Sequence, residues 1–257
     1  MSAEDGGTGS HMLVEHFTTT HFPEDPVLDA AYAAALLRRT ATTPDSDALV
    51  RLYNPAPTLS FGRLDALRTQ FPDAVEAARR HGFTPVVRSA GGRAAAYHEQ
   101  SLVLEIFAPD TQGMTGARAR FRELTTRLVS VLRDLGIDAR IGAVPGEYCP
   151  GDWTINGAAR VKLAGTAQRI ISGAWLFGAE LVVTDPEPTR AVLTDVNAAL
   201  DLEFDPSTAA ALADFNPAIS LEKVRIAILT DLGAAREVVP EPGVIADAIS
   251  NRASHAP

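Results

Sequence analysis

The chain has a single cysteine among its 257 residues, so it cannot form an internal disulfide. It also has no apolar run near the roughly 18 residues that span a bilayer, and no signal-peptide pattern opens it. These absences predict a protein of the reducing cytoplasm that does not enter a membrane. Histidine, cysteine and acidic residues do not cluster at ligand spacing, so the sequence predicts no metal site.

The sequence also has no excess of basic residues. The 23 lysines and arginines are outnumbered by 32 aspartates and glutamates, which gives a net charge of −9. Binding to nucleic acid requires a clustered basic surface, because every phosphate carries a negative charge. The charge balance therefore excludes nucleic acid as the main partner.

The rest of the composition is that of a globular domain. Hydrophobic residues make up 46% of the chain and charged residues 21%, and a chain of this length can bury a full core. Residues 1–15 are predicted to be a flexible tail, and Gly9-Ser10-His11-Met12 within it resembles the remnant of a cleaved expression tag. Residues 16–240 are predicted to form a single domain and residues 241–257 a second tail.

Predicted strands occupy the middle of the chain, and predicted helices lie at both ends. Apolar residues recur at helical spacing after Pro26 and over residues 74–80, 118–135, 191–199, 208–213 and 221–232. Short apolar runs predict strands over residues 49–53, 58–61, 84–88, 94–98, 102–107, 153–155, 160–163, 167–171 and 174–183. Hairpin connections outnumber βαβ units, so we predict an α/β (α+β) domain with a mixed, largely antiparallel central sheet flanked by helices.

Two adjacent glycines follow one of these strands. Gly91 and Gly92 let the backbone approach a ligand closely, and the donors of Arg93 suit a carboxylate, a phosphate or an acyl carbonyl. On these residues alone, a tight turn with a solvated arginine is the favoured interpretation. The loop does not match the glycine patterns of nucleotide-binding sites.

Tyr97 and His98 end the next predicted strand and are followed by Glu99. Imidazole and carboxylate groups can perform acid–base chemistry. Adjacent residues on a strand point to opposite faces, however, so His98 and Glu99 cannot form a simple catalytic pair. A structural His98, hydrogen-bonded near the loop, is at least as compatible with the sequence.

The cysteine and a nearby lysine form the sharper pair. Asn156-Gly157 is the strongest short hairpin signal in the chain, and a two-residue loop there places Lys162 opposite Gly151, whereas a four-residue loop through Ala159 would move the lysine away. Cys149 is then a diagonal neighbour of Lys162 on the same face of the sheet, with backbone positions roughly 7–8 Å apart. An ammonium beside a thiol stabilises the nucleophilic thiolate and can stabilise an oxyanion. Burial of Cys149 as a small apolar residue is equally compatible with this geometry.

Three segments in order resemble the biotin/lipoate protein ligase superfamily. Residues 57–63 are similar to its apolar strand ending in Gly-Arg, and residues 88–99 resemble its lipoate-binding loop, Arg-Arg-x-x-Gly-Gly-(Gly/Arg)-Ala-Val-x-His-Asp. Residues 161–169 resemble its catalytic-lysine strand, Lys-(Ile/Leu/Phe)-Ala-Gly-x-(Ala/Ser)-Gln. The resemblance runs from about Asp29 to about Leu200 and implies a fold like that of the class II aminoacyl-tRNA synthetases.

The same resemblance implies that Lys162 holds an acyl carbonyl and that the acyl tail lies in an apolar tunnel. The chain departs from the family pattern at Ser89, at Glu99 and in the small residues 94–96, so the acyl chain length is left open. The implied substrate-binding residues are Arg63, Arg88, Gly91, Gly92, Arg93, Ala94, Tyr97, His98, Gly165, Thr166 and Ala167.

Cys149 discriminates within the superfamily. Tyr-Cys-Pro-Gly ahead of the lysine strand resembles the amidotransferases that move an octanoyl group from the glycine cleavage H protein to other lipoyl domains. In those enzymes a cysteine in this segment carries the acyl thioester. The resemblance therefore implies octanoyl or lipoyl transfer to the acceptor lysine of lipoyl domains, with Cys149 as nucleophile. Lys162 and the backbone N–H groups near Gly91 and Gly92 would stabilise the oxyanion, and no cofactor is required.

The implied partners are lipoyl-domain proteins, namely the glycine cleavage H protein and the acyltransferase subunits of 2-oxoacid dehydrogenases, with acyl carrier protein as another donor. Docking of an acidic carrier domain needs a local basic patch. Four arginines on the predicted helix 118–135 are candidates, although a solvated helix face is the favoured interpretation; they are Arg118, Arg120, Arg122 and Arg127.

Two other functions remain open. An ATP-dependent lipoate–protein ligase would use ATP and Mg, and Cys149 would be incidental to it. Such ligases often carry an accessory domain, and only about 55 residues follow the matched region, which favours the transferase. The second alternative is a protein that binds lipoate or another acyl group without turnover.

Overall fold

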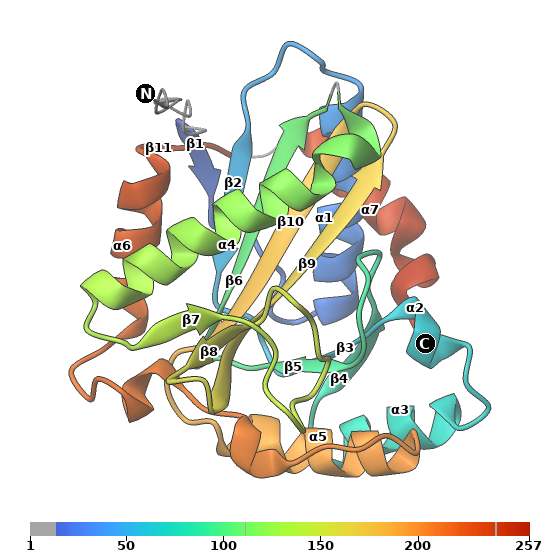
Figure 1. The fold of residues 1–257 in the computed structure, drawn as a ribbon. Helices are drawn as coiled ribbons and strands as arrows, with labels where there is room; N and C mark the ends of the chain where they lie inside the picture. The colour runs from blue at the N-terminus through green and yellow to red at the C-terminus, as the bar shows by residue number, and fades with distance from the viewer. Residues whose placement is uncertain (1–13, 111, 240) are drawn as a thin grey trace.

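The computed structural model describes residues 14–110, 112–239 and 241–257. An eight-stranded sheet in the order β11-β1-β2-β6-β10-β9-β8-β7 forms its centre (Figure 1). The β11–β1 and β1–β2 pairs are parallel, and the other described pairs of this sheet are antiparallel. The strands are β1 (His16–Thr18), β2 (Leu49–Tyr53), β6 (Ser101–Pro109), β7 (Ala139–Ile141), β8 (Ile155–Gly157), β9 (Val161–Ile171), β10 (Ala174–Val182) and β11 (Arg236–Glu237).

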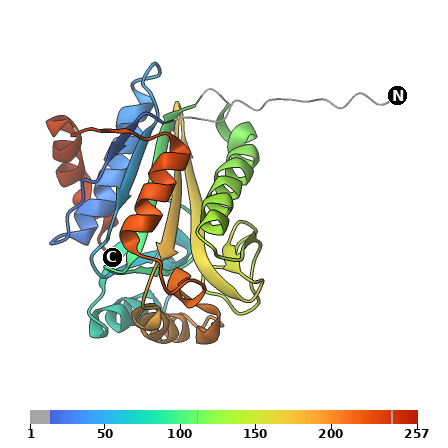
Figure 2. The same ribbon diagram turned by 90° about the vertical axis from the view of Figure 1, so that its left-hand side faces the viewer.

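Helices cover both faces of this sheet, which confirms the predicted fold class. The helices α4 (Ala117–Asp134) and α6 (Leu221–Leu232) lie on one face, and α1 (Pro26–Ala41) and α7 (Pro242–Asn251) lie on the other. Seen edge-on in Figure 2, α1 and α7 are on one side of the strands and α4 is on the opposite side. Within the described residues, every helix is too short or too polar to cross a bilayer.

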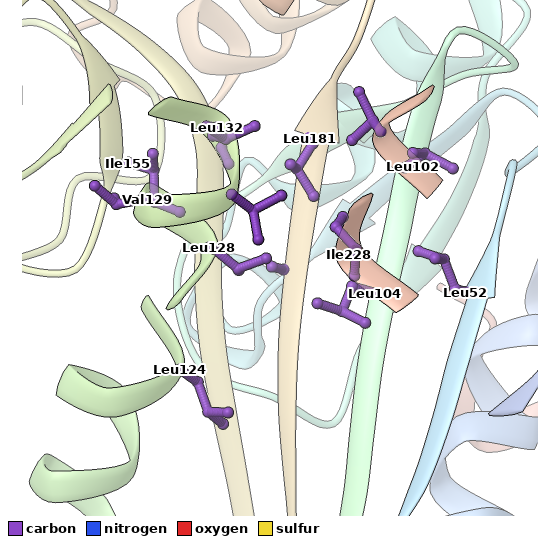
Figure 3. Close-up of a cluster of buried hydrophobic side chains, with 14 of the residues drawn as sticks. Leu52, Leu102, Leu104, Leu124, Leu128, Val129, Leu132, Ile155, Leu181 and Ile228 are labelled. Atoms are coloured by element: carbon purple, nitrogen blue, oxygen red, sulfur yellow. The ribbon is translucent and has the colours of Figure 1, made fainter. Parts of the chain in front are cut away.

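The larger core lies between the sheet and the pair α4 and α6. Leu124, Leu128 and Leu132 of α4 recur at helical spacing and point at the sheet, as Figure 3 shows. Leu104 and Leu181 come from the strands beneath, and all five side chains are buried. Successive side chains of β6 and β10 point to opposite faces of the sheet, so the second face of these strands packs against α1 and borders the site described below.

Helix ends carry recognisable signals. Pro26 opens α1 directly after Asp25, whose carboxylate accepts the backbone N–H of Leu28. Ser220 caps α6 by accepting the N–H of Lys223, and Gly233 ends that helix with φ 75°.

A second, three-stranded sheet in the order β4-β3-β5 lies at one end of the main sheet. Its strands are β3 (Thr58–Phe61), β4 (Thr84–Val87) and β5 (Ala95–Tyr97). The helices α3 (Phe71–Arg80) and α5 (Glu187–Ala199) run side by side below it in Figure 1 and share a core with it. The four-residue helix α2 (Arg63–Ala66) connects β3 to α3. The small sheet and the main sheet together frame a cavity.

The C-terminal segment differs from its prediction as a tail. Residues 242–251 form α7, and Val244 and Ala248 are buried against α1. Three ion pairs join the segment to the N-terminal part of the domain: Arg38 with Asp247 and Arg39 with Glu241, both at 2.8 Å, and Arg252 with Asp25 at 2.6 Å. The predicted tail over residues 1–15 lies almost wholly outside the described residues. Val14, the first of them, is fully buried.

The predicted helix over residues 208–213 is also wrong. The chain there forms two short 3-10 turns, Pro206–Thr208 and Leu212–Asp214, with extended residues between them. The N–H of Ala210 bonds to the carbonyl of Lys162 at 3.1 Å, so this segment runs beside β9 instead of coiling. The remaining 3-10 turns are Gly113–Gly116 and Arg252–His255.

Candidate active site

A cavity of about 420 Å³ lies where the two sheets meet, and it contains most of the predicted site. Its wall includes strand residues from β5, β6, β9 and β10 and two loops, residues 88–92 and 148–154. Nine predicted site residues line it: Arg88, Gly91, Gly92, Tyr97, Cys149, Lys162, Gly165, Thr166 and Ala167. The other four, Arg63, Arg93, Ala94 and His98, do not.

Cys149 is held against the glycine loop. Its Sγ atom accepts the backbone N–H of Arg93 at 3.1 Å and lies 4.0 Å from Nη2 of Arg88. The backbone of Cys149 has φ 43°, a left-handed conformation that is uncommon for a residue other than glycine. A Cβ atom on Gly92 would lie 2.8 Å from this Sγ, so the position must be glycine for the sulfur to approach the loop. The sulfur is half-buried and faces the cavity with hydrogen-bond donors behind it.

The side chain of Arg88 holds the glycine loop together by hydrogen bonds. Its guanidinium donates to the carbonyls of Gly91 at 2.9 Å and Arg93 at 2.6 Å, and it also bonds to the carbonyl of Ser60 on β3. These bonds close the loop into a tight turn around one arginine side chain. They turn the Arg93 N–H toward Cys149.

The guanidinium of Arg93, predicted to bind a ligand, contacts an acidic side chain outside the cavity lining. Nη1 pairs with Oδ1 of Asp65 at 3.2 Å, and Asp65 is fully buried in α2. The second carboxylate oxygen of Asp65 accepts the N–H of Gly62 at 3.2 Å. Arg93 therefore anchors the loop to α2 through its side chain and contributes to the site through its backbone N–H.

Lys162 holds the backbone of the cysteine segment. Its Nζ donates to the carbonyls of Tyr148 and Cys149, both at 2.9 Å, and lies 3.6 Å from Oε2 of Glu147. The ammonium also lies 4.5 Å from the centre of the Tyr148 ring. The lysine is 1% exposed, so these contacts replace water around its charge.

The predicted nearness of Cys149 and Lys162 is confirmed, but the hairpin geometry behind it is wrong. Asn156 and Gly157 lie within β8, and the turn comprises residues 158–160, with φ 52° at Ala158 and 59° at Ala159. Lys162 therefore pairs with Asn156 rather than with Gly151. Cys149 reaches the lysine because the loop before β8 folds back over β9.

Packing explains why the Asn-Gly pair is not a turn. A Cβ atom on Gly157 would lie 2.3 Å from the ring of Phe215, so the glycine provides room for an aromatic side chain. The amide of Asn156 donates to the carbonyl of Gly142 at 2.7 Å, and its oxygen accepts the N–H of Ala159 at 2.9 Å. Tertiary contacts thus override the local signal.

His98, for which the sequence left both a binding and a structural role open, is buried away from the cavity lining. Its ring is 3% exposed, lies outside the cavity lining, and accepts the N–H of Gln100 at 3.3 Å through Nδ1. Burial lowers the pKa of His98, which keeps the imidazole neutral over a wider range of pH. Ala94 is buried in the core below the small sheet, and Arg63 is exposed on α2.

Two of the four candidate arginines on α4 are bound within the fold. Arg120 pairs with Asp110 at 3.4 Å and stacks on Trp175, and Arg127 pairs with Asp231 at 2.9 Å. Arg118 and Arg122 are exposed. A basic docking patch on this helix therefore rests on these two exposed side chains.

Sequence reasoning missed a buried ionic network at the cavity wall. Arg51 of β2 is fully buried and donates to the carboxylates of Asp29 and of Glu105, the latter at 2.9 Å. Its guanidinium also lies over the Tyr53 ring at 4.0 Å. Asp29, Tyr53 and Glu105 line the cavity. An arginine and a glutamate within predicted strands were the only sequence signals for this network.

Glu180 was missed as well. It lies on β10 in an otherwise apolar run, lines the cavity and is 5% exposed. Burial raises the pKa of Glu180 to about 8, although Lys162, Ser101 and Tyr148 each favour its ionised form. A single acidic residue at a core-facing position of an apolar strand is the signal that could have revealed it.

Residues 25–243 match the protein-family model described as the lipoyl protein ligase A/B catalytic domain. The octanoyl-GcvH:protein N-octanoyltransferase of Geobacillus kaustophilus is 26% identical over 177 residues, which cover 68% of this chain and 62% of that protein. The protein of the same name from Exiguobacterium sp. is 30% identical over 135 residues, covering 52% of this chain and 47% of that protein. The chain thus spans about half to three-fifths of the length of these curated relatives.

Solved structures share the architecture. A lipoate-protein ligase A bound with ATP superposes with a TM-score of 0.75 at 21% identity, over 94% of this chain and 95% of that chain. This likeness establishes the fold, and the family match extends over most of the sequence, including both the loop around Cys149 and the strand of Lys162. The protein is therefore a member of the lipoyl protein ligase A/B catalytic domain family.

Proposed function

We propose that this protein transfers an octanoyl group from an octanoylated lipoyl-domain protein, such as GcvH, to the acceptor lysine of another lipoyl domain. The observation that carries the proposal is the placement of Cys149. Its sulfur faces the cavity, accepts the N–H of Arg93 at 3.1 Å, and belongs to a segment held by Lys162. The names of the curated relatives support this reaction, because they describe octanoyl transfer from GcvH to proteins.

In the first half-reaction, the Cys149 thiolate attacks the carbonyl carbon of the octanoyl-lysine amide. A C–S bond forms, the C–N bond breaks, and the donor lysine leaves as an amine after gaining the proton that the Cys149 thiol lost on ionising. The N–H of Arg93 is next to the sulfur and can donate to the oxyanion on the adjacent carbon. Lys162 keeps the cysteine segment in place and adds positive charge at the same end of the cavity.

The cavity suits an acyl chain. Its volume of about 420 Å³ is within the range of about 300–1,000 Å³ that is usual for small-molecule sites. Gly165, Ala167 and Gly178 leave space over the main sheet, and Val103 and Leu176 supply apolar wall. In the second half-reaction, the acceptor lysine attacks the thioester and releases Cys149. The proposed reaction uses no metal or cofactor; ATP and Mg belong to the ligase alternative.

A direct test separates transferase from ligase. The protein is incubated with octanoylated GcvH without ATP, and its intact mass is measured before and after hydroxylamine, which cleaves thioesters. We expect one hydroxylamine-labile octanoyl adduct, followed by octanoylation of an added unmodified lipoyl domain. A parallel reaction contains free octanoate, ATP and Mg. Product formed only in the parallel reaction would contradict the proposal and identify an ATP-dependent ligase.

The contact between Gly62 and the glycine loop provides a second prediction. A Cβ atom at Gly62 would lie 1.8 Å from the carbonyl oxygen of Gly92, so alanine must displace the loop. Because the loop carries the Arg93 N–H, we expect Gly62→Ala to slow acylation of Cys149 by about 10²-fold, as misplacement by about 1 Å can do. Single-turnover acylation by octanoylated GcvH measures this rate.

The matched control is Gly243→Ala. A Cβ atom there would meet nothing within 4 Å, and the residue lies on α7, which packs against α1 away from the loop. We expect its acylation rate to equal that of the wild type. Equal rates for Gly62→Ala and the wild type would show that the position of the loop does not control the reactivity of Cys149.

A further inference from the structure

Glu180 is a buried carboxyl group without a well-formed hydrogen bond in the part of the chain that the structure describes. It lies on β10 opposite Val103 of β6 and Gly165 of β9, and it is 5% exposed. Among the described residues, neither of its carboxyl oxygens has a well-formed hydrogen bond, although the nearby hydroxyls of Ser101 and Tyr148 favour its ionised form as hydrogen-bond donors. An unpaired buried carboxyl costs stability, so its presence calls for a ligand that supplies donors.

The carboxyl lies at the reacting end of the cavity. The ammonium of Lys162 acts on it directly. The charges of Glu180 and Cys149 both act on the phenols of Tyr97 and Tyr148, so both groups are close to the same two side chains. All five residues line the cavity.

The chemistry of the proposed reaction identifies the missing donor. An octanoyl chain carries no hydrogen-bond donor, and its carbonyl oxygen only accepts. The acceptor lysine brings three N–H donors on a positive charge, and it must lose a proton before it can attack. Lys162 does not fill this role, because its ammonium donates to the carbonyls of Tyr148 and Cys149 and also lies 3.6 Å from the carboxylate of Glu147.

We propose that Glu180 is a catalytic residue that binds the ammonium of the acceptor lysine and accepts its proton. The proposal rests on the proposed octanoyl transfer. The Glu180 carboxylate takes one proton and becomes a neutral acid, and the freed amine forms a C–N bond with the thioester carbon. The C–S bond then breaks, and the Cys149 sulfur receives the second proton lost by the nitrogen. One ammonium, one carboxylate and one thioester thus give one amide, one carboxylic acid and one thiol.

Burial makes this carboxylate a more effective base. Proton transfer from a lysine of pKa about 10.4 to a group with pKa about 8 is unfavourable by only about 10²-fold. The same transfer to a carboxyl group with the ordinary glutamate pKa of 4.5 would be unfavourable by about 10⁶-fold. The active, ionised form of Glu180 increases as pH rises through about 8. Transfer by the wild type should therefore rise with pH up to this point and level off until the lysine itself titrates.

The test isolates the second half-reaction. Cys149 is first acylated with a small octanoyl thioester, because its thiol leaving group does not need the proton that an amine leaving group needs. Single-turnover transfer to an unmodified lipoyl domain is then followed between about pH 6 and pH 10. For Glu180→Gln we expect unchanged acylation by the thioester and transfer about 10²-fold slower than wild type. The plateau above about pH 8 should vanish, and the rate should follow the free amine of the acceptor.

The control is Glu203→Gln, which removes an exposed carboxyl outside the cavity lining and should leave both the rate and the pH profile unchanged. Wild-type transfer with a wild-type pH profile in Glu180→Gln would overturn the proposal. So would an equal loss of thioester acylation, which would mean that the site had collapsed. Failure of the wild type to form any thioester would instead contradict the proposed function. The two failures are therefore distinguishable.

A stability measurement checks that the glutamine variant is folded. Because burial raises the pKa of Glu180 from 4.5 to about 8, the folded protein binds an extra proton between these values. Stability therefore falls as pH rises through this interval and stays at the lower level above it. Glu180→Gln removes this penalty, so its melting temperature should exceed that of the wild type at pH 8 and differ less near pH 5. A less stable variant at pH 8 would contradict the unpaired state of this carboxyl.

Discussion

Replacing Cys149 with serine should abolish the octanoyl adduct and lower octanoyl transfer by at least about 10³-fold. A serine hydroxyl is a poor nucleophile unless an adjacent base removes its proton. The groups beside the sulfur are the N–H of Arg93 and the guanidinium of Arg88, and both are donors. Neither can accept a proton from serine, so the substituted oxygen would remain a neutral alcohol.

The measurement combines intact mass with a single-turnover transfer assay, using octanoylated GcvH as donor. Serine differs from cysteine by one atom, and the backbone at this position already has φ 43°, so the melting temperature should stay within a few degrees of the wild type. Transfer that persists in Cys149→Ser without ATP would show that another group carries the acyl chain. Activity that persists only with ATP would show that Cys149 has a packing role.

Replacing Arg51 with methionine should have the largest effect on folding. Arg51 is fully buried and pairs with Asp29 and Glu105, and removing one partner from such a network costs about 3–5 kcal/mol. Burial raises the pKa of both carboxyl groups even with the arginine present. Without it, their pKa values rise further, and the folded protein must take up protons to avoid two unpaired buried charges.

The pH dependence of this loss provides the check. A carboxyl group with a raised pKa in the folded state destabilises the protein as pH rises above the pKa of the unfolded chain. The stability difference between Arg51→Met and the wild type should therefore be larger at pH 8 than at pH 5, as measured by denaturant unfolding. The triple variant Arg51→Met, Asp29→Asn, Glu105→Gln should recover much of the loss, because no charge is then left unpaired. A loss below about 1 kcal/mol, or one independent of pH, would contradict the network as described.

The parts of the site that could be predicted from the sequence lie in short continuous segments. The loop with Gly91 and Gly92, the strand of Lys162 and the segment of Cys149 each carry their signal within about ten residues, and the structure brings all three to one cavity. The fold class, a largely antiparallel sheet flanked by helices, could also be predicted from the sequence, because short strands and turn residues alternate along the middle of the chain.

The parts of the site that could not be predicted depend on how strands far apart in the sequence pair with each other. Arg51 of β2 meets Glu105 of β6 because the two strands are antiparallel neighbours, and nothing near either residue indicates its partner. Glu180 is an acidic residue in an apolar strand, but only the fold shows that its face of β10 borders the cavity. The turn predicted at Asn156-Gly157 is wrong for the same reason, because the packing of Gly157 depends on the ring of Phe215, which is far along the chain.

The close packing of the Cys149 sulfur against Gly92 also has a kinetic consequence. One side of the sulfur is closed by the loop, so any carbonyl must approach it from the cavity side. Under the proposed reaction, donor lysine and acceptor lysine then use the same entrance and the same face of the bound acyl group. The two carrier domains cannot occupy that entrance together, so each must leave before the next one arrives, and an excess of either should inhibit the other competitively.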